Sequence, residues 1–286
     1  MAAGPRPLAP AGCRRAQGAY SGATAGEEIR MSKSEYTACV VVIGNEILSG
    51  RTQDANLQYL AKKLTDWGVR LKEARVIPDI EEVIVRTINE VRAAFDYVFT
   101  TGGIGPTHDD ITADAVAKAF GVKLVCHQET FRKMEAVYKP GEFNAARQKM
   151  CDIPEGASVI ENAVSIAPGF QMGNVFVLAG VPAIMRAMVD TLRNRLVGGP
   201  PIQSRTVSVY LAEGVIADGF ATLQKQYPAI DMGSYPFYRA GRFGTSLVLR
   251  GTETASLDRA AAELTAFVRA LGAEPAQEPR EEGKGP

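Results

Sequence analysis

Thr101-Gly102-Gly103-Ile104-Gly105-Pro106-Thr107-His108-Asp109-Asp110 is the stretch of this sequence that decides the fold class. Residues 97–100 form a short apolar run typical of a buried strand, and residues 112–120 have the apolar spacing of a helix. Glycines allow the backbone to turn with positive φ, and the N–H groups at a helix start attract an anion. The stretch therefore predicts a strand, a helix and, between them, a phosphate-binding loop that includes Thr101, Gly102, Gly103, Gly105 and Thr107.

Predicted strands and helices alternate on both sides of this loop. Residues 38–43 and 69–77 have the composition of buried strands, and residues 54–66 have the apolar spacing of a helix. The apolar positions of a further helix are Ile80, Ile84, Ile88 and Val91. This alternation predicts an α/β fold with a mainly parallel sheet flanked by helices.

Three polar segments follow predicted strands. They are residues 44–46, residues 78–79 and the loop 101–110. Ligands of parallel sheets bind at the carboxyl ends of the strands, so these segments are expected to share one rim.

The chain continues with a charged segment over 126–150, predicted to be helical, and a strand over 174–178 that is followed by Gly180 and Pro182. Two glycines and two prolines at 198–201 then mark a break. The pattern beyond it predicts strands at 205–211, 231–235 and 246–250, a helix at 217–226, and a last helix with Leu271 among its inward positions. The predicted organisation is an α/β domain at 36–198 and a small α+β subdomain at 202–272, with disordered segments at 1–35 and 273–286.

Composition excludes several classes of protein. The 286 residues include 32 basic and 32 acidic side chains, and a zero net charge argues against a general nucleic-acid binder. No apolar run is long enough for a membrane span, so no membrane partner is expected. Four cysteines without CxxC spacing indicate reduced thiols and a cytoplasmic protein, and two histidines argue against a histidine-rich zinc site.

The first 26 residues contain basic side chains and no acidic ones. This composition has some likeness to a mitochondrial transit peptide. The alternatives are an ordinary N-terminal extension or a true start at Met31, and the composition favours them.

The carboxylates around the loop suggest a cation. A helix needs only one cap, so either Asp109 or Asp110 can cap the helix at 112–120 while the other lies beside the phosphate. A divalent cation takes one or two carboxylates together with phosphate oxygens. Asp79 either caps the following helix or joins Asp110 at the rim.

Four further residues have a similar pair of interpretations. Asn45 and Glu46 follow the first strand, and Asn56 opens the first helix, so each is either a ligand group or ordinary helix-start chemistry. His108 either assists a leaving group or is an exposed loop histidine.

The loop is not a dinucleotide-binding Rossmann loop, because it follows the third strand and has His108 where the last glycine is required.

The motifs together resemble the competence/damage-inducible protein A family over roughly residues 38–270. The matching strings are Gly44-Asn45-Glu46-Ile47-Leu48-Ser49-Gly50, Asn56, Pro78-Asp79, the loop 101–112, Ala167-Pro168-Gly169-Phe170 and Gly180-Val181-Pro182. The resemblance implies the molybdopterin-binding fold that is also found in molybdenum-cofactor biosynthesis proteins and in FAD synthase. It also implies a dimer or trimer, and it stops short of the C-terminal amidohydrolase domain of full-length family members.

The resemblance assigns roles to residues of this chain. In adenylyltransferase relatives two aspartates handle Mg²⁺ and the pterin phosphate, and they match Asp79 and Asp110. The departures are Ala163 and Ser165, where the family has proline and glycine, and Ile184, where it has glutamate. Loss of that glutamate bears on whether the chain is catalytically active.

Three functions follow as hypotheses. The first is hydrolysis of a nucleotide pyrophosphate such as ADP-ribose or FAD. Mg²⁺, Mn²⁺ or Co²⁺ on Asp79, Asp109 and Asp110 would activate water, with Gly44, Asn45, Glu46, Asn56, Gly180 and Pro182 around the substrate. The second is binding or adenylation of molybdopterin, and the third is a non-catalytic nucleotide- or pterin-binding module. The second unit, shared with the competence-protein branch, favours the first.

One segment of the second unit stands apart from these hypotheses. Residues 231–242 hold Tyr235, Phe237, Tyr238 and two arginines. This composition is typical of a hairpin edge, and the alternative is a stacking surface for a base.

Overall fold

The computed structural model describes residues 1, 33, 35–239 and 241–276. By its internal contacts the chain divides into two units between Ser32 and Lys33. Residues 1–35 were predicted to be disordered, and of these the structure describes only Met1, Lys33 and Glu35. Residues 277–286 of the predicted C-terminal tail also lie outside the described residues. Lys33 and Glu35 are both in ion pairs, so the N-terminal boundary was predicted slightly too late.

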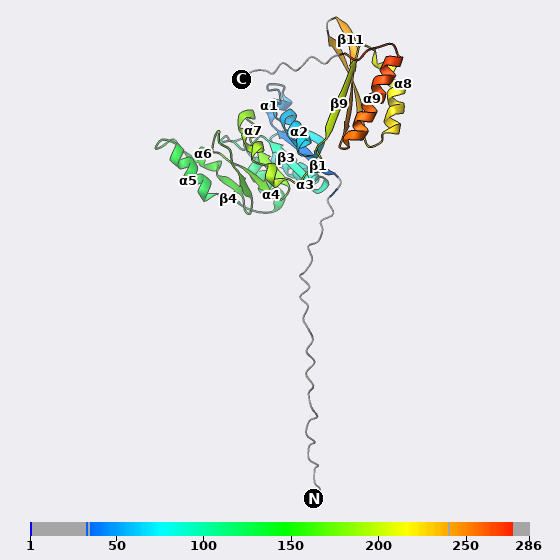
Figure 1. Ribbon diagram of the computed structural model, residues 1–286. Coiled ribbons are helices and arrows are strands. Elements are labelled where there is room, and N and C mark those ends of the chain that lie inside the picture. Colours follow the sequence, from blue (N-terminus) through cyan, green and yellow to red (C-terminus); the bar gives the residue numbers. More distant parts are fainter. Residues whose placement is uncertain (2–32, 34, 240, 277–286) are drawn as a thin grey trace. The chain divides into compact units, whose positions relative to one another are not determined.

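The first domain contains the following elements in chain order (Figure 1): β1 (Tyr36–Ile43), α1 (Asn45–Leu48), α2 (Asn56–Asp66), β2 (Val69–Ile77), α3 (Glu81–Ala94), β3 (Tyr97–Thr101), α4 (Thr112–Phe120), β4 (Leu124–Cys126), α5 (Gln128–Val137), α6 (Ala145–Lys149), β5 (Asp152–Pro154), β6 (Ser158–Ile160), β7 (Gly169–Met172), β8 (Val175–Leu178), α7 (Pro182–Asp190) and the 3₁₀ turn η1 (Arg193–Arg195).

Six of these strands form one sheet in the order β2-β1-β3-β8-β7-β6. The first four are parallel, and β7 and β6 add an antiparallel edge. This confirms the predicted mainly parallel α/β sheet. The chain leaves β1 toward β2 on one side and returns to β3 on the other, so the strand order reverses between β1 and β3, and their carboxyl ends flank the crevice where such sheets bind ligands.

Each face of the sheet has its own buried core. Val40 and Phe99 point to the face covered by α2 and α7, where Leu64 and Met188 are also buried. On this face the rings of Phe99 and Phe176 stack at 5.0 Å. Alternate strand residues point to the other face, where α3 and α4 supply their apolar side chains. Burial of each such large side chain stabilises the fold by about 1.5–3 kcal/mol, which fixes both layers of helices.

The segment 126–150 differs from its prediction. It contains two short helices, α5 and α6, because Pro140 and Gly141 interrupt the helical spacing. Strands β4 to β7 have three or four residues each, too few for a periodic pattern. Ile80, predicted to point inward, is 48% exposed because it is the residue that caps α3 and not part of the helix.

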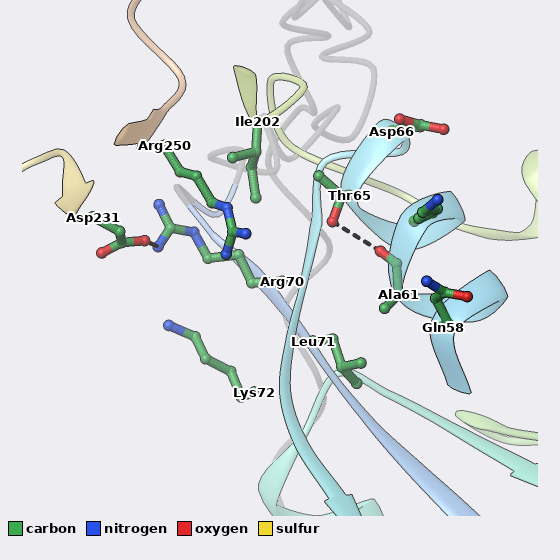
Figure 2. Close-up of a pocket in the computed structure, with 11 residues that line it drawn as sticks. Gln58, Ala61, Thr65, Asp66, Arg70, Leu71, Lys72, Ile202, Asp231 and Arg250 are labelled. Atoms are coloured by element: carbon green, nitrogen blue, oxygen red, sulfur yellow. Dashed lines mark hydrogen bonds and ion pairs between the residues drawn. The ribbon is translucent and has the colours of Figure 1, made fainter. Parts of the chain in front are cut away.

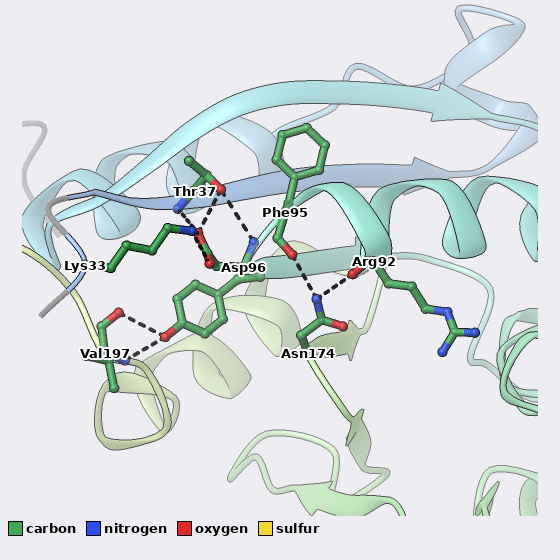
Figure 3. A network of polar contacts seen from close by, with 8 residues as sticks. Lys33, Thr37, Arg92, Phe95, Asp96, Asn174 and Val197 are labelled. Atoms are coloured by element: carbon green, nitrogen blue, oxygen red, sulfur yellow. Dashed lines mark hydrogen bonds and ion pairs between the residues drawn. The ribbon is translucent and has the colours of Figure 1, made fainter. Parts of the chain in front are cut away.

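A polar network joins the amino ends of the central strands (Figure 3). The carboxylate of Asp96 accepts hydrogen bonds from the Lys33 ammonium at 2.6 Å and from the Thr37 N–H at 2.8 Å. The Asn174 amide donates to the carbonyl oxygens of Arg92 and Phe95 at the end of α3. These contacts lie at the opposite end of the strands from the predicted site.

The second unit contains β9 (Gln203–Val209), α8 (Glu213–Gln226), β10 (Asp231–Arg239), β11 (Arg242–Gly251) and α9 (Thr254–Ala270). The strands form an antiparallel sheet in the order β10-β11-β9, and α8 and α9 cover one of its faces (Figure 1). This confirms the small α+β subdomain, with longer hairpin strands than predicted.

Two details at the end of this unit differ from the prediction. Leu271 is 38% exposed because it is the residue that caps α9. The N–H of Ala276 donates to the carbonyl of Ser208, so the predicted tail begins too early. Among the described helices, none is long and apolar enough to cross a membrane.

Candidate functional site

The loops after β1, β3 and β8 meet at the carboxyl edge of the sheet. The Gly102 N–H donates to the carbonyl of Leu178 at 3.1 Å, which joins the loop after β3 to the end of β8. A Cβ added to Gly102 would lie 2.1 Å from the Ile43 carbonyl oxygen, and one added to Gly180 would lie 3.3 Å from the Gly102 Cα. The predicted segments therefore share one rim, and small residues allow their backbones to meet.

The glycine loop has the backbone that its sequence predicted. Gly102 and Gly103 have φ of 105° and 69°, values that favour glycine. Thr112, the first residue of α4, closes the loop: its hydroxyl donates to the Gly102 carbonyl and its N–H to the Gly103 carbonyl. Among the described residues, the N–H groups of Gly103, Ile104 and Gly105 donate to no protein acceptor, whereas that of Gly102 does and is not free for a phosphate.

Asp110 organises the loop and does not cap α4. Its Oδ2 accepts hydrogen bonds from the Thr107 N–H at 2.8 Å and from the Thr107 hydroxyl at 2.5 Å. Helix α4 is preceded by Ile111 and has no side-chain cap. The predicted cap by Asp109 or Asp110 was therefore wrong, and the Thr107 hydroxyl proton is directed to Asp110 and not to a phosphate.

Asp79 likewise bonds across the rim and does not cap the helix that follows it. Its Oδ2 accepts a hydrogen bond from the Asn45 N–H at 2.8 Å, which joins the end of β2 to the loop after β1. Helix α3 has no side-chain cap, which excludes the capping interpretation of Asp79. Burial raises the pKa of Asp79, the Asn45 N–H opposes this, and the charges of Glu46 and Asp109 raise the pKa further.

Asn56 and Thr101 place polar atoms in a small pocket at this edge. The pocket, of about 60 Å³, is also lined by Glu46, Gly102, Gly180 and Pro182, all predicted as site residues. The Asn56 Nδ2 donates to the Gly180 carbonyl at 2.8 Å, which fixes the orientation of the amide. Its Oδ1 and the Thr101 hydroxyl are buried without a partner among the described residues. A buried polar atom without a partner costs about 1–3 kcal/mol, so these two atoms favour a site that is completed by water or ligand.

Two residues that contact the site were not predicted from the sequence. Lys149, in α6, donates a hydrogen bond from its ammonium to the Asp110 carbonyl oxygen at 2.8 Å. It also lines a second small pocket together with Gly103, Gly105 and Asp110. Asp54 accepts hydrogen bonds from the N–H groups of Asn56 and Leu57 and so positions the start of α2. A carboxylate two residues before a helix was a sequence signal for Asp54, but none existed for Lys149, which is 39 residues from Asp110.

The other predicted residues are placed as follows. Glu46 is exposed, and its carboxylate lies beside Gly44. The N–H of Gly44 donates to the Ile77 carbonyl and so continues the hydrogen bonds between β1 and β2. The side chain of His108 is 98% exposed, which agrees with the exposed-loop interpretation. Ile184, at the position of the family glutamate, packs against the core beneath α7.

A divalent cation fits the donor atoms of this rim in part. Asp79 and Asp110 each keep one oxygen, Oδ1, without a hydrogen-bond partner among the described residues. No three acidic, cysteine or histidine side chains in this part of the chain are clustered closely enough to hold a metal by themselves. Mg²⁺ usually takes only one or two carboxylates and completes its shell with phosphate oxygens and water, so the rim suits a cation that arrives with a phosphate ligand.

A larger pocket lies elsewhere (Figure 2). It has a volume of about 640 Å³, and its lining includes Gln58, Ala61 and Thr65 of α2 and Arg70 and Leu71 of β2. None of the predicted site residues lines it. Volume alone therefore does not identify the site in this molecule.

Two known families match successive parts of the chain. Residues 39–197 match the family described as probable molybdopterin binding domain, and residues 201–275 match the middle domain of FAD synthase. The second unit, attributed above to the competence-protein branch, thus matches a model built on FAD synthase.

Individual relatives support both matches. A protein of Archaeoglobus fulgidus, named only as a protein, is 36% identical over 197 residues, which cover 69% of this chain and 84% of its own length. A probable FAD synthase of Caenorhabditis briggsae is 32% identical over 253 residues, which are 78% of this chain but only 47% of that protein. The solved structure of the CinA protein of unknown function from Thermoplasma acidophilum has 31% identity and a TM-score of 0.54, and the match covers 57% of this chain and 99% of that one. The chain therefore belongs to the probable molybdopterin binding domain family and carries a CinA-like domain of this type.

Proposed function

We propose that the first domain binds the pyrophosphate of a dinucleotide, of which FAD is the leading candidate, and hydrolyses it with the help of a divalent cation. The observation that carries this proposal is that three N–H groups, from Gly103, Ile104 and Gly105, donate to no acceptor among the described residues and lie on the same rim as the carboxylates of Asp79 and Asp110. The N–H groups suit phosphate oxygens.

The charges of the rim support a role for the cation. Glu46, Asp79, Asp109 and Asp110 surround the loop, and among the described residues the ammonium that contacts it is that of Lys149. Such a rim repels a pyrophosphate. A bound divalent cation, held by Asp79 and Asp110 with Asp109 nearby, would neutralise this repulsion and supply Lewis-acid chemistry.

The chain itself would orient the substrate. Gly103 to Gly105 would donate to phosphate oxygens, and Lys149 would add positive charge on the same side. The Asn56 Oδ1 would accept a hydrogen bond from a neutral donor of the substrate, such as a ribose hydroxyl, since its Nδ2 is already used by Gly180. The likeness of residues 201–275 to the FAD synthase middle domain favours FAD over ADP-ribose.

The test is a hydrolysis screen with the purified full chain. FAD, ADP-ribose, NAD and adenylated molybdopterin would be offered with Mg²⁺, Mn²⁺ or Co²⁺, and AMP release would be measured. Asp110→Asn is the informative variant, because the amide oxygen can still accept from the Thr107 N–H while the charge is lost. Asp66→Asn, at an exposed carboxylate in the last turn of α2, is the matched control.

Metal-dependent AMP release that is lost in Asp110→Asn and kept in Asp66→Asn supports the proposal. If the wild type releases no AMP from any of these compounds, hydrolysis is refuted.

A second candidate is a binding module for a phosphate-bearing pterin or nucleotide, without catalysis. The observation that favours it is Ile184, which stands where the family has a glutamate and packs its apolar side chain against the core. Tight binding of molybdopterin or FAD without turnover would support this alternative.

A further inference from the structure

The sheet of the second unit has one face turned away from its helices. Leu247 and Leu249 of β11 point toward α8 and α9. Residues of the opposite alternation, among them Tyr235 and Phe237 of β10, point to the other face. Tyr210, which follows β9, contacts the ring of Phe237 on that face. We refer to this surface, together with Arg239 and Arg242, as the aromatic face.

The two arginines of the aromatic face lie at one end of the β10–β11 hairpin. Arg239 and Arg242 are direct partners across the strands. Neither forms an ion pair with an acidic side chain among the described residues. Like charges directly opposite each other on a sheet are destabilising, so this pair favours an anion that would lie between them.

Each guanidinium lies over an aromatic ring. Arg239 lies 4.6 Å from the centroid of Phe237, and Arg242 lies 4.3 Å from that of Tyr210. A guanidinium that stacks by its face keeps its N–H donors free at its edges, where they match phosphate oxygens. The two cations are thus positioned for an anion before one binds.

The ring of Phe237 packs over a glycine. Phe237 lies over the buried Gly244, since a Cβ added there would be 2.4 Å from the ring. Phe237 also meets Tyr210 edge to face at 5.6 Å. Tyr235, two residues earlier in β10, is 48% exposed, with its ring beside Gly233. It offers an exposed flat ring about 7 Å along the strand from Phe237.

We propose that the aromatic face binds a nucleoside diphosphate group, with the base on Tyr235 and the two phosphates on Arg239 and Arg242. Two cations match two phosphates. Arg239 lies over Phe237, which is about 7 Å along the strand from Tyr235, and this spacing suits a base and a phosphate that are separated by one ribose. A single-stranded nucleic acid would need a longer track of cations, which the zero net charge of the chain does not favour. This site is independent of the activity proposed for the first domain.

The test is equilibrium binding of ADP to the full chain in EDTA, measured by titration calorimetry. Chelation removes the cation that the first domain is proposed to need. We expect the double variant Arg239→Ala/Arg242→Ala to bind ADP at least about tenfold more weakly than the wild type, because two charge-assisted contacts are lost. Tyr235→Leu should also weaken binding of ADP, but not binding of inorganic pyrophosphate, which has no base.

Two controls separate this site from others. Arg259→Ala removes an exposed arginine from α9, which covers the opposite face of the sheet, and should leave ADP affinity unchanged. Asp110→Asn should also leave it unchanged, so that a failure of the function proposed for the first domain does not affect this result. Equal ADP affinity in the wild type and the double arginine variant would overturn the proposal. So would the absence of ADP binding together with affinity for single-stranded oligonucleotides that rises with their length.

Discussion

Substitution of Gly102 by alanine tests whether the close approach of backbones at the rim fixes the site. At a φ of 105° an alanine is strained by about 1–3 kcal/mol. Its Cβ would also lie 2.1 Å from the Ile43 carbonyl oxygen, a backbone atom of the central strand that cannot move without disturbing the sheet. Overpacking of this kind costs a further ~1–3 kcal/mol. Gly121→Ala is the matched control, because Gly121 also has a positive φ, of 68°, but a Cβ there meets nothing within 4 Å.

The assay is thermal unfolding followed by tryptophan fluorescence. The chain has one tryptophan, Trp67, which packs against the core of the first domain and therefore reports on that domain alone. The midpoint of Gly102→Ala should lie below that of Gly121→Ala by about 4–8 °C, for an extra cost of about 2 kcal/mol. Midpoints within one degree of each other would refute the reasoning that the Ile43 carbonyl holds the glycine loop in place.

Three further outcomes follow from the ionisable groups. Burial raises the pKa of both Cys39 and Cys151 from 9.0 to about 11, so alkylation at pH 8 should be at least about 100-fold slower at these thiols than at a free cysteine, as mass spectrometry of labelled peptides can measure. Burial acts to raise the pKa of Asp96, but the hydrogen bonds from Lys33 and Thr37 lower the pKa overall. At a pH above the ordinary carboxyl pKa, Asp96→Asn should therefore lower the free energy of unfolding in urea by about 1–3 kcal/mol. This loss relative to the wild type should shrink as the pH falls through the pKa of Asp96 in the folded state. The pKa of Asp79 is instead raised, which means that folding disfavours its ionised form. Asp79→Asn should therefore not lower the melting temperature at neutral pH, and a clear fall in the melting temperature would show that the charge stabilises the fold.

Local patterns were sufficient to predict most of the first domain. The bounds of β2 and α4 agree with the predicted residues 69–77 and 112–120, because apolar periodicity marks them, Gly68 and Pro78 flank β2, and Gly121 ends α4. The common rim also followed from the predicted parallel sheet, since carboxyl ends of parallel strands must share an edge. The short strands between residues 124 and 172 could not be predicted in this way, because pairing across the chain, not local periodicity, creates them.

The partners of the rim carboxylates were beyond the reach of sequence patterns. Asp79 was placed at the rim, but its bond to the Asn45 N–H, 34 residues away, depends on how β1 and β2 align. Asp110 lies next to a helix start, yet its carboxylate turns back to Thr107. In both cases an aspartate would suit a helix cap equally well. Only the three-dimensional path of the loop decides whether the carboxylate caps a helix or binds a backbone N–H group of a loop.

The two candidate sites differ in their electrostatics, and this difference makes them separable. The rim of the first domain is acidic, so an anionic ligand should bind there only together with a divalent cation. The aromatic face of the second unit presents Arg239 and Arg242 without acidic partners among the described residues, so it should bind a diphosphate without any cation. Addition of EDTA should therefore abolish nucleotide binding that depends on Asp110 and preserve binding that depends on Arg239 and Arg242. Added salt should have the opposite selectivity to EDTA. It should weaken ligand binding at the exposed Arg239 and Arg242 more than at the partly buried, cation-bridged rim, because salt screens solvent-exposed charges most strongly.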